Sequence, residues 1–135
     1  MNIIIIGASP TGASLIELAL ESGHKVTLIE ENEERARQIL EQHNITVLNA
    51  DIAKGGILDE AKADQADALV ATTNDDSANL MAIFLGKKHG IKKLAVMLNN
   101  RQHKEMFEKL GVNVLVDPAT IIAQRLYSFI ESESK

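Results

Sequence analysis

The first thirty residues hold two features that together can bind a nucleotide, a glycine turn and an acidic residue. The turn is Gly7-Ala8-Ser9-Pro10-Thr11-Gly12, and Glu30 stands 18 residues beyond Gly12. In nucleotide-binding units of this kind the turn lies against the phosphates, and the acid accepts hydrogen bonds from the adenosine ribose hydroxyls. Because the charge of Glu30 would repel a 2′-phosphate, the pattern favours an unphosphorylated ribose over NADP.

Two strands and a helix must position these residues. Residues 2–6, with β-branched isoleucine at positions 3–6, form the run that a strand buried on both faces of a parallel sheet requires. A helix follows and ends at Gly23, and its expected apolar face comprises Leu15, Leu18 and Ala19. Residues 25–29 predict a second strand with Glu30 at its carboxyl end, which completes the first βαβ unit.

The rest of the chain alternates predicted helices and strands. We expect helices at residues 31–43, 57–61, 75–88, 100–110 and from 118 onward, and strands at residues 45–49, 66–72, 93–98 and 112–116. The side chains expected to face inward from the middle helices are Ala36, Ile39, Leu40, Leu80, Met81, Ile83, Phe84, Met106, Phe107 and Leu110. This order predicts a single α/β domain over residues 1–130, with a doubly wound, mostly parallel, six-stranded Rossmann-like sheet, and a disordered tail at 131–135.

In such a sheet, ligands bind outside the carboxyl ends of the strands, where the strand order switches next to the first strand. This rule gathers residues 7–12, Glu30, Asp51 and residues 72–74 around one crevice. Some of these residues could instead have a purely structural role. Glu30 could be a solvated acid that caps the following helix, and Asp51 could be the N-cap of the segment after it. The polar run Thr72-Thr73-Asn74-Asp75 is also typical of a helix start.

The composition argues against several other classes of function. The chain has 135 residues, about one domain, with no cysteine and a net charge of −5. We therefore expect no thiolate chemistry and no nucleic-acid partner. The four histidines lack metal-ligand spacing, so we expect no metal site. Because no run approaches the ~18 apolar residues of a membrane span, we expect a cytoplasmic protein without direct membrane insertion.

Several motifs follow one another along nearly the whole chain. They are Gly7-x-x-x-x-Gly12, Gly23-His24-x-Val26, Glu30, the Asp51 turn, Ala71-x-Thr73-Asn74-Asp75-Asp76-x-x-Asn79-Leu80 and Phe107-x-Lys109-Leu110-Gly111. This ordered set resembles the N-terminal nucleotide-binding domain of Trk/Ktr-type potassium-transport regulators, also called the RCK or KTN domain. The resemblance implies a cytoplasmic, non-catalytic regulatory subunit that forms a homo-oligomer, dimeric or higher. It implies that this assembly lies at the inner face of the cell membrane through a potassium transporter or channel subunit.

The resemblance also implies a ligand and assigns roles to individual residues. NAD(H), ATP, ADP or AMP would bind in the crevice, change the shape of the assembly and gate ion flux. Residues 7–12 would hold the phosphates and Glu30 the ribose. Asp51 and Ile52 would contact the adenine edge, and Thr73 with Asn74 would form the far wall. Thr72 is expected to line the pocket as well.

Three residues depart from the family pattern. Ser9 replaces the usual second glycine, Pro10 follows it, and Met97 replaces a basic residue common at the end of the fifth strand. A Cβ at Ser9 intrudes on a pyrophosphate, Pro10 lacks an amide donor, and Met97 brings no cation. The domain would then bind a nucleotide weakly, bind a less charged one such as AMP, or have lost binding. In the structural alternative, Ser9-Pro10 is an N-cap followed by proline at the first helical position.

Two other functions remain open from the sequence. One is a small NAD-dependent oxidoreductase, although the chain lacks a substrate domain and a constellation that could move a proton. The other is a scaffold of the same fold that binds nothing. The last helix carries an apolar stripe that is either core or an interface to a second subunit, formed by Ile121, Ile122, Leu126, Tyr127 and Phe129.

Overall fold

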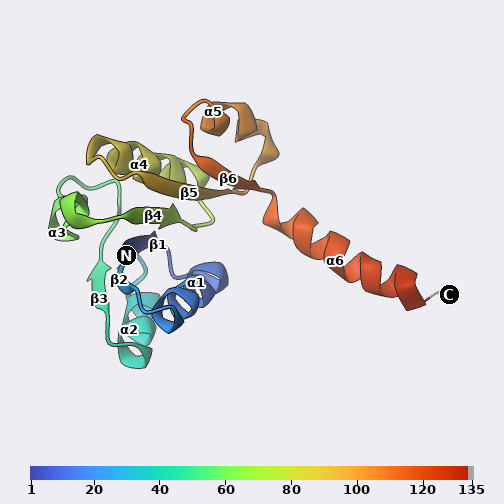
Figure 1. Ribbon diagram of the computed structural model, residues 1–135, viewed down its shortest axis with the longest axis horizontal. Helices are drawn as coiled ribbons and strands as arrows, with labels where there is room; N and C mark the ends of the chain where they lie inside the picture. The colour runs from blue at the N-terminus through green and yellow to red at the C-terminus, as the bar shows by residue number, and fades with distance from the viewer. Residues whose placement is uncertain (134–135) are drawn as a thin grey trace.

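The computed structural model describes residues 1–133 and contains one six-stranded parallel sheet (Figure 1). Its strands are β1 (Asn2–Ile6), β2 (Lys25–Glu30), β3 (Thr46–Asn49), β4 (Ala68–Ala71), β5 (Lys93–Leu98) and β6 (Asn113–Val116). They lie in the order β3-β2-β1-β4-β5-β6. The predicted doubly wound sheet is confirmed, and the switch in strand order falls beside β1.

The helices cover the two faces of this sheet unequally (Figure 1). They are α1 (Pro10–Glu21), α2 (Glu33–Gln42), α3 (Ile57–Glu60), α4 (Asp76–Lys88), α5 (Lys104–Glu108) and α6 (Pro118–Glu133), with the 3₁₀ turns η1 (Ala63–Gln65) and η2 (Arg101–His103). Helices α1 and α2 lie on one face, whereas α3, α4 and α5 lie on the other. After β6, helix α6 projects away from the body of the domain.

Two buried clusters correspond to the two faces. The cluster on the α4 face draws on β1, β4 and β5 and includes Ile4, Ile6, Leu69, Ile83, Leu98 and Phe107. The buried residues of the cluster on the α1 face are Ile5, Ile16, Ala19, Val26, Leu28 and Ile39. Successive isoleucines of β1 enter opposite clusters because side chains alternate along a strand. Strands β4, β5 and β6 contribute nothing to the buried cluster on the α1 face, which leaves that half of the sheet without a helical cover.

Some side chains predicted to face inward are exposed, and those predictions were wrong. They are Leu18, Leu40, Met81, Phe84 and Met106. The physical reason is that a helix lying on a sheet buries a narrow stripe, and apolar spacing alone does not say which of two adjacent stripes that is. Helix α1 buries Ile16 and Ala19 instead, and α4 buries Ala82 and Ile83.

Two predicted boundaries also differ from the structure. The helix expected at 100–110 is divided into η2 and α5, because the side chain of Asn100 accepts a hydrogen bond from the amide of Gln102 and tightens the first turn. The disordered tail was expected from residue 131, but α6 continues through Glu133. The rest of that predicted tail, residues 134 and 135, lies outside the described residues.

Helix α6 carries an apolar face that is largely exposed. Six of its large side chains are between 47% and 66% exposed: Ile121, Ile122, Leu126, Tyr127, Phe129 and Ile130. The core interpretation of this stripe was therefore wrong, and the interface interpretation stays a prediction. None of the helices within residues 1–133 is both long enough and apolar enough to cross a membrane.

Candidate nucleotide-binding site

A crevice with a volume of about 210 Å³ opens at the carboxyl ends of β1 and β2, beside the switch in strand order. The predicted site residues that line it are Gly7, Ser9, Glu30, Asp51, Ile52, Thr73 and Asn74. Residues from four separate parts of the sequence meet here because the strand ends of a parallel sheet share one edge.

The other predicted site residues lie beside the crevice without lining it. Pro10, Thr11 and Thr72 line a separate groove on the other side of the turn. Gly12 is buried in the packing of the turn, and Ala8 contributes its backbone amide to Glu30. The glycine turn therefore forms a wall between two hollows.

Glu30 is the central charged group of the crevice, and only 6% of its surface is exposed. Its Oε1 accepts a hydrogen bond from the amide of Ala8 at 2.7 Å, and its Oε2 accepts one from the amide of Asn32 at 2.9 Å. Since Asn32 is the N-cap of α2, Glu30 does support the start of that helix. It is a buried acid, however, and each carboxylate oxygen keeps a lone pair for a further donor.

Gly7 and Gly12 let the turn close tightly. Gly7 has a φ of +100°, and a Cβ on Gly12 would lie 2.0 Å from the carbonyl oxygen of Gly7. The buried hydroxyl of Thr72 donates to the carbonyl oxygens of Ile6 and Gly7, each at 3.0 Å. Thr72 therefore fixes the turn from β4 rather than lining the crevice.

Ser9 is the N-cap of α1, and Pro10 is the first residue of that helix. The Oγ of Ser9 accepts a hydrogen bond from the amide of Gly12 at 3.3 Å and donates one to the carbonyl oxygen of Thr72 at 3.1 Å. The capping interpretation of Ser9-Pro10 is therefore confirmed. Its consequence is that the cap occupies an amide that an anion at the helix N-terminus would otherwise use.

Asn79, fully buried on α4, holds the far wall of the crevice in place. Its Oδ1 accepts hydrogen bonds from the amide and the hydroxyl of Thr73, at 3.1 and 2.7 Å. Its Nδ2 donates to the carbonyl oxygens of Thr73 at 3.0 Å and Met97 at 2.8 Å. The side chain of Met97 itself lines the separate groove, so the missing basic residue of the family pattern stands outside the crevice lining.

One lining residue of the crevice, a cation, was not predicted from the sequence. Arg35 lies in the first turn of α2 and lines the crevice, and its place shortly after Glu30 at a helix start was the available signal. Asp51 lies nearby and accepts a hydrogen bond from the amide of Ala53 at 2.9 Å. Asp51 therefore closes a turn after β3, whereas the N-cap of α3 is Gly56.

Asp76 organises the neighbouring carboxyl end of β5, and only 10% of its side chain is exposed. Its Oδ1 and Oδ2 accept hydrogen bonds from the amides of Asn99 and Asn100, each at 2.8 Å. Burial by itself raises the pKa of Asp76. The bonds from these amides, from the Asn99 side chain and from His103 outweigh burial and hold the pKa below its ordinary value. Asp75 instead caps α4, so the adjacent carboxylates have separate structural roles.

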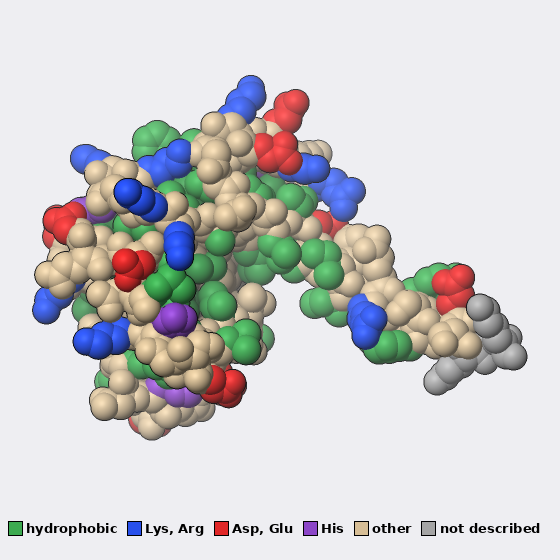
Figure 2. Space-filling model, viewed as in Figure 1, with side chains coloured by type: hydrophobic (Ala, Val, Ile, Leu, Met, Phe, Trp, Pro, Cys, Tyr) green, Lys and Arg blue, Asp and Glu red, His purple; other side chains and the backbone are tan. Residues whose placement is uncertain are grey.

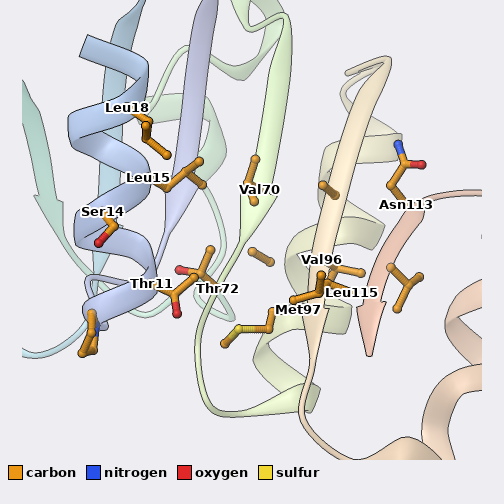
Figure 3. Close-up of a pocket in the computed structure, with 14 residues that line it drawn as sticks. Thr11, Ser14, Leu15, Leu18, Val70, Thr72, Val96, Met97, Asn113 and Leu115 are labelled. Atoms are coloured by element: carbon orange, nitrogen blue, oxygen red, sulfur yellow. The ribbon is translucent and has the colours of Figure 1, made fainter. Parts of the chain in front are cut away.

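The separate groove is larger, about 730 Å³, and mostly apolar. Its lining residues come from α1 on one side and from the uncovered halves of β4, β5 and β6 on the other, including Leu15, Leu18, Val70, Val96, Met97 and Leu115 (Figure 3). The space-filling view shows hydrophobic side chains gathered in the hollow between the body of the domain and the base of α6 (Figure 2). The sequence did not predict this groove, because the apolar strands β4 and β5 do not themselves indicate whether a helix covers each of their faces.

Comparison with known sequences defines the class of protein. The model of the TrkA-N domain family matches residues 3–118, so the chain belongs to that family. It is 31% identical over 130 residues to a Trk system potassium uptake protein TrkA homolog of Methanothermobacter thermautotrophicus, which covers 96% of this chain and 60% of that protein. It is 36% identical over 125 residues to the Trk system potassium uptake protein TrkA of Vibrio alginolyticus, covering 90% of this chain and 27% of that protein. The chain thus spans three fifths or less of the length of these two relatives.

Comparison with solved structures supports the fold. The crystal structure of the GsuK RCK domain superposes with a TM-score of 0.82 at 22% identity, covering 99% of this chain and 29% of that one. The NAD(P)-binding domain of an exopolyphosphatase-related protein from Archaeoglobus fulgidus gives a TM-score of 0.77 at 20% identity, covering 96% of this chain and 97% of that one. At these identities the likeness establishes a Rossmann-like architecture.

Proposed function

We propose that this domain is the nucleotide-sensing module of a regulator of potassium transport, and that its crevice binds the adenosine part of NAD(H) or of an adenine nucleotide. The observation that carries the proposal is the buried Glu30 carboxylate. Two backbone amides orient it at the end of β2, and each oxygen keeps one lone pair. The 2′- and 3′-hydroxyls of a ribose supply two matching donors.

Four further predicted site residues line the crevice together with this carboxylate. Asp51 and Ile52 lie at the end of β3, where the adenine edge would sit, and Thr73 and Asn74 form the opposite wall. Structures of the same fold include the GsuK channel bound to NAD, GsuK bound to ADP and a Shewanella denitrificans Kef CTD in AMP-bound form. These ligands share the adenosine group that the crevice is proposed to hold.

The proposed role is regulatory rather than catalytic. The charged groups in the described lining of the crevice are carboxylates and one guanidinium, with no histidine, lysine or tyrosine among them. Those three residue types are the usual proton donors and acceptors near a nicotinamide ring. A ligand bound here would act through its different affinity for two states of an assembly.

Thermal unfolding with NAD⁺, NADH, ATP, ADP and AMP tests the nucleotide proposal. A ligand at 100 times its Kd is expected to raise the free energy of unfolding by about 2.7 kcal/mol. Glu30→Gln is expected to remove that increase. The substitution replaces one acceptor oxygen by an NH₂ donor, so the side chain can no longer accept hydrogen bonds from two backbone amides and two ribose hydroxyls. The control is Glu41→Gln, an exposed acid on α2 outside the crevice. The absence of any shift with all five nucleotides would contradict the proposal.

We also propose that the protein forms a homo-oligomer in which α6 of one copy lies in the apolar groove of another. Helix α6 has 16 residues and is therefore about 24 Å long, and its exposed stripe is apolar like the groove. Each copy carries both the helix and the groove, so a two-fold axis would satisfy both copies at once. The pairing would cover the half of the sheet that has no helix of its own.

Light scattering across a range of concentrations tests this pairing. Leu126→Asp on α6 and Leu18→Asp in the groove are both expected to shift the protein to monomer, because each places a charge in the contact. Leu40→Asp is the matched control, since Leu40 is an equally exposed leucine on α2 that does not line the groove. A wild-type protein that stays monomeric at high concentration would exclude the pairing.

The partner and the location follow from the family and are proposals as well. The two sequence relatives described above are named as potassium uptake proteins. We propose that residues 1–130 form the nucleotide-binding domain of a cytoplasmic subunit. This subunit would be held at the inner face of the cell membrane by a potassium transporter or channel subunit.

A further inference from the structure

We propose that the crevice selects an adenine nucleotide with a single phosphate, AMP, over NAD and over ATP. This inference rests on the proposed nucleotide-sensing function and names the ligand of that same site. Three independent features of the crevice support it: the amides of the glycine turn, the charge of the lining and the size of the cavity.

The amides that would hold a pyrophosphate are mostly used within the chain. The first turn of a helix binds anions through its free N–H groups. In α1, Pro10 has no N–H, and the N–H of Gly12 donates to Ser9 Oγ. Just before the helix, the N–H of Ala8 donates to Glu30 at 2.7 Å. Among the first three residues of α1, this leaves the amide of Thr11, and Thr11 lines the apolar groove rather than the crevice. The start of α1 therefore offers the crevice too few amides for a pyrophosphate.

The charge of the lining opposes a polyphosphate. Four carboxylates line the crevice, from Glu30, Glu31, Asp51 and Asp75, and Arg35 is the cation among the described lining residues. Each further phosphate of ADP or ATP would add negative charge beside this acidic surface. AMP carries the least phosphate charge of the three and therefore meets the least repulsion.

The size of the cavity opposes a dinucleotide. Its volume of about 210 Å³ lies below the range of roughly 300–1,000 Å³ that is usual for sites of drug-sized ligands. Toward β4 it is closed by Thr73, Asn74 and Asp75, and Asn79 fixes this wall with hydrogen bonds of 2.7–3.1 Å to Thr73. The enclosed part of the crevice therefore has room for one nucleoside, and the nicotinamide half of NAD would have to lie outside it.

Isothermal titration calorimetry with adenosine, AMP, ADP, ATP and NAD⁺ tests the selection. We expect the Kd of wild-type protein for AMP to be lower than that for NAD⁺ or ATP by about tenfold or more, the equivalent of one charge-assisted hydrogen bond. In a Ser9→Gly/Pro10→Ala variant, the amides of residues 10 and 12 become free and the Cβ at residue 9 is removed. This variant is expected to bind NAD⁺ and ADP about tenfold more tightly than wild type does, with adenosine affinity unchanged.

The design separates this inference from the function on which it rests. The control is Ser14→Ala, one turn further along α1 and facing the apolar groove, which should leave all five affinities unchanged. Glycine is an adequate N-cap, and Pro10→Ala alone repeats the comparison if the double variant is unstable. Wild-type binding of NAD⁺, ADP or ATP as tight as that of AMP would overturn the selection while leaving the nucleotide-sensing function intact. Failure of every nucleotide to bind would overturn both.

Discussion

Replacing Asn79 by alanine is expected to destabilise the protein more than any other single asparagine substitution near the crevice. Asn79 is fully buried and makes hydrogen bonds with both ends of its side-chain amide. After substitution, the carbonyl of Thr73 keeps a bond from Asn99, and the hydroxyl of Thr73 keeps its bond to Asp75. The amide of Thr73 and the carbonyl of Met97 would lose the partner that Asn79 supplies.

The magnitude follows from those two groups. A buried polar group left without a partner costs about 1–3 kcal/mol. Water can reach part of the Thr73 amide because that residue is only half-buried, whereas the Met97 carbonyl bond is buried. The expected loss in the free energy of unfolding is therefore about 2–4 kcal/mol, with the far wall of the crevice loosened at the same time.

Urea unfolding at neutral pH measures this loss through the midpoint at unchanged slope. Asn99→Ala is the matched control, because the side chain of Asn99 also donates to the Thr73 carbonyl, at 3.1 Å, but is exposed. It is expected to cost less than about 1 kcal/mol, since water replaces the lost bonds to Thr73 and Asp76 at this exposed position. Equal losses for the two variants would refute the argument that burial of Asn79 sets its contribution.

Three further substitutions test the turn and the neighbouring carboxyl end of β5. Gly12→Ala should prevent stable folding, because its Cβ would lie 2.0 Å from the Gly7 carbonyl oxygen. The control is Gly55→Ala, whose Cβ meets no atom within 4 Å and should change the melting temperature little. Thr72→Val, which removes the buried hydroxyl bonded to two backbone carbonyls, should lower the free energy of unfolding by about 2 kcal/mol, and Thr72→Ser should restore most of it. The lowered pKa of Asp76 contributes stability that is present above about pH 4 and is lost as the pH falls through the folded-state pKa. Asp76→Asn should therefore be less stable than wild type at pH 7 and lose less stability between pH 5 and pH 2; identical acid unfolding curves would contradict the assignment.

The fold could be predicted because its signals are local. The isoleucine run of residues 3–6 and the alternation of strand and helix patterns identified a parallel sheet, and Gly7 and Glu30 marked the edge of the sheet where the crevice lies. Which stripe of each helix is buried was less predictable. Leu18 satisfies the apolar period of α1 but lies outside the buried stripe, because the docking angle of a helix depends on the whole sheet.

The sequence by itself determined the order of elements and the crevice at the switch in strand order, and it offered the N-cap as one of two interpretations of Ser9-Pro10. Each of these depends on residues close together in the chain or on a general rule of parallel sheets. Only the tertiary structure decided that Thr72 supports the turn, that Arg35 lines the crevice and that α1 faces an apolar groove. Such features arise where side chains from separate elements meet. Which side chains contact one another there is set by packing across the sheet, and the apolar periodicity of a single element does not predict that packing.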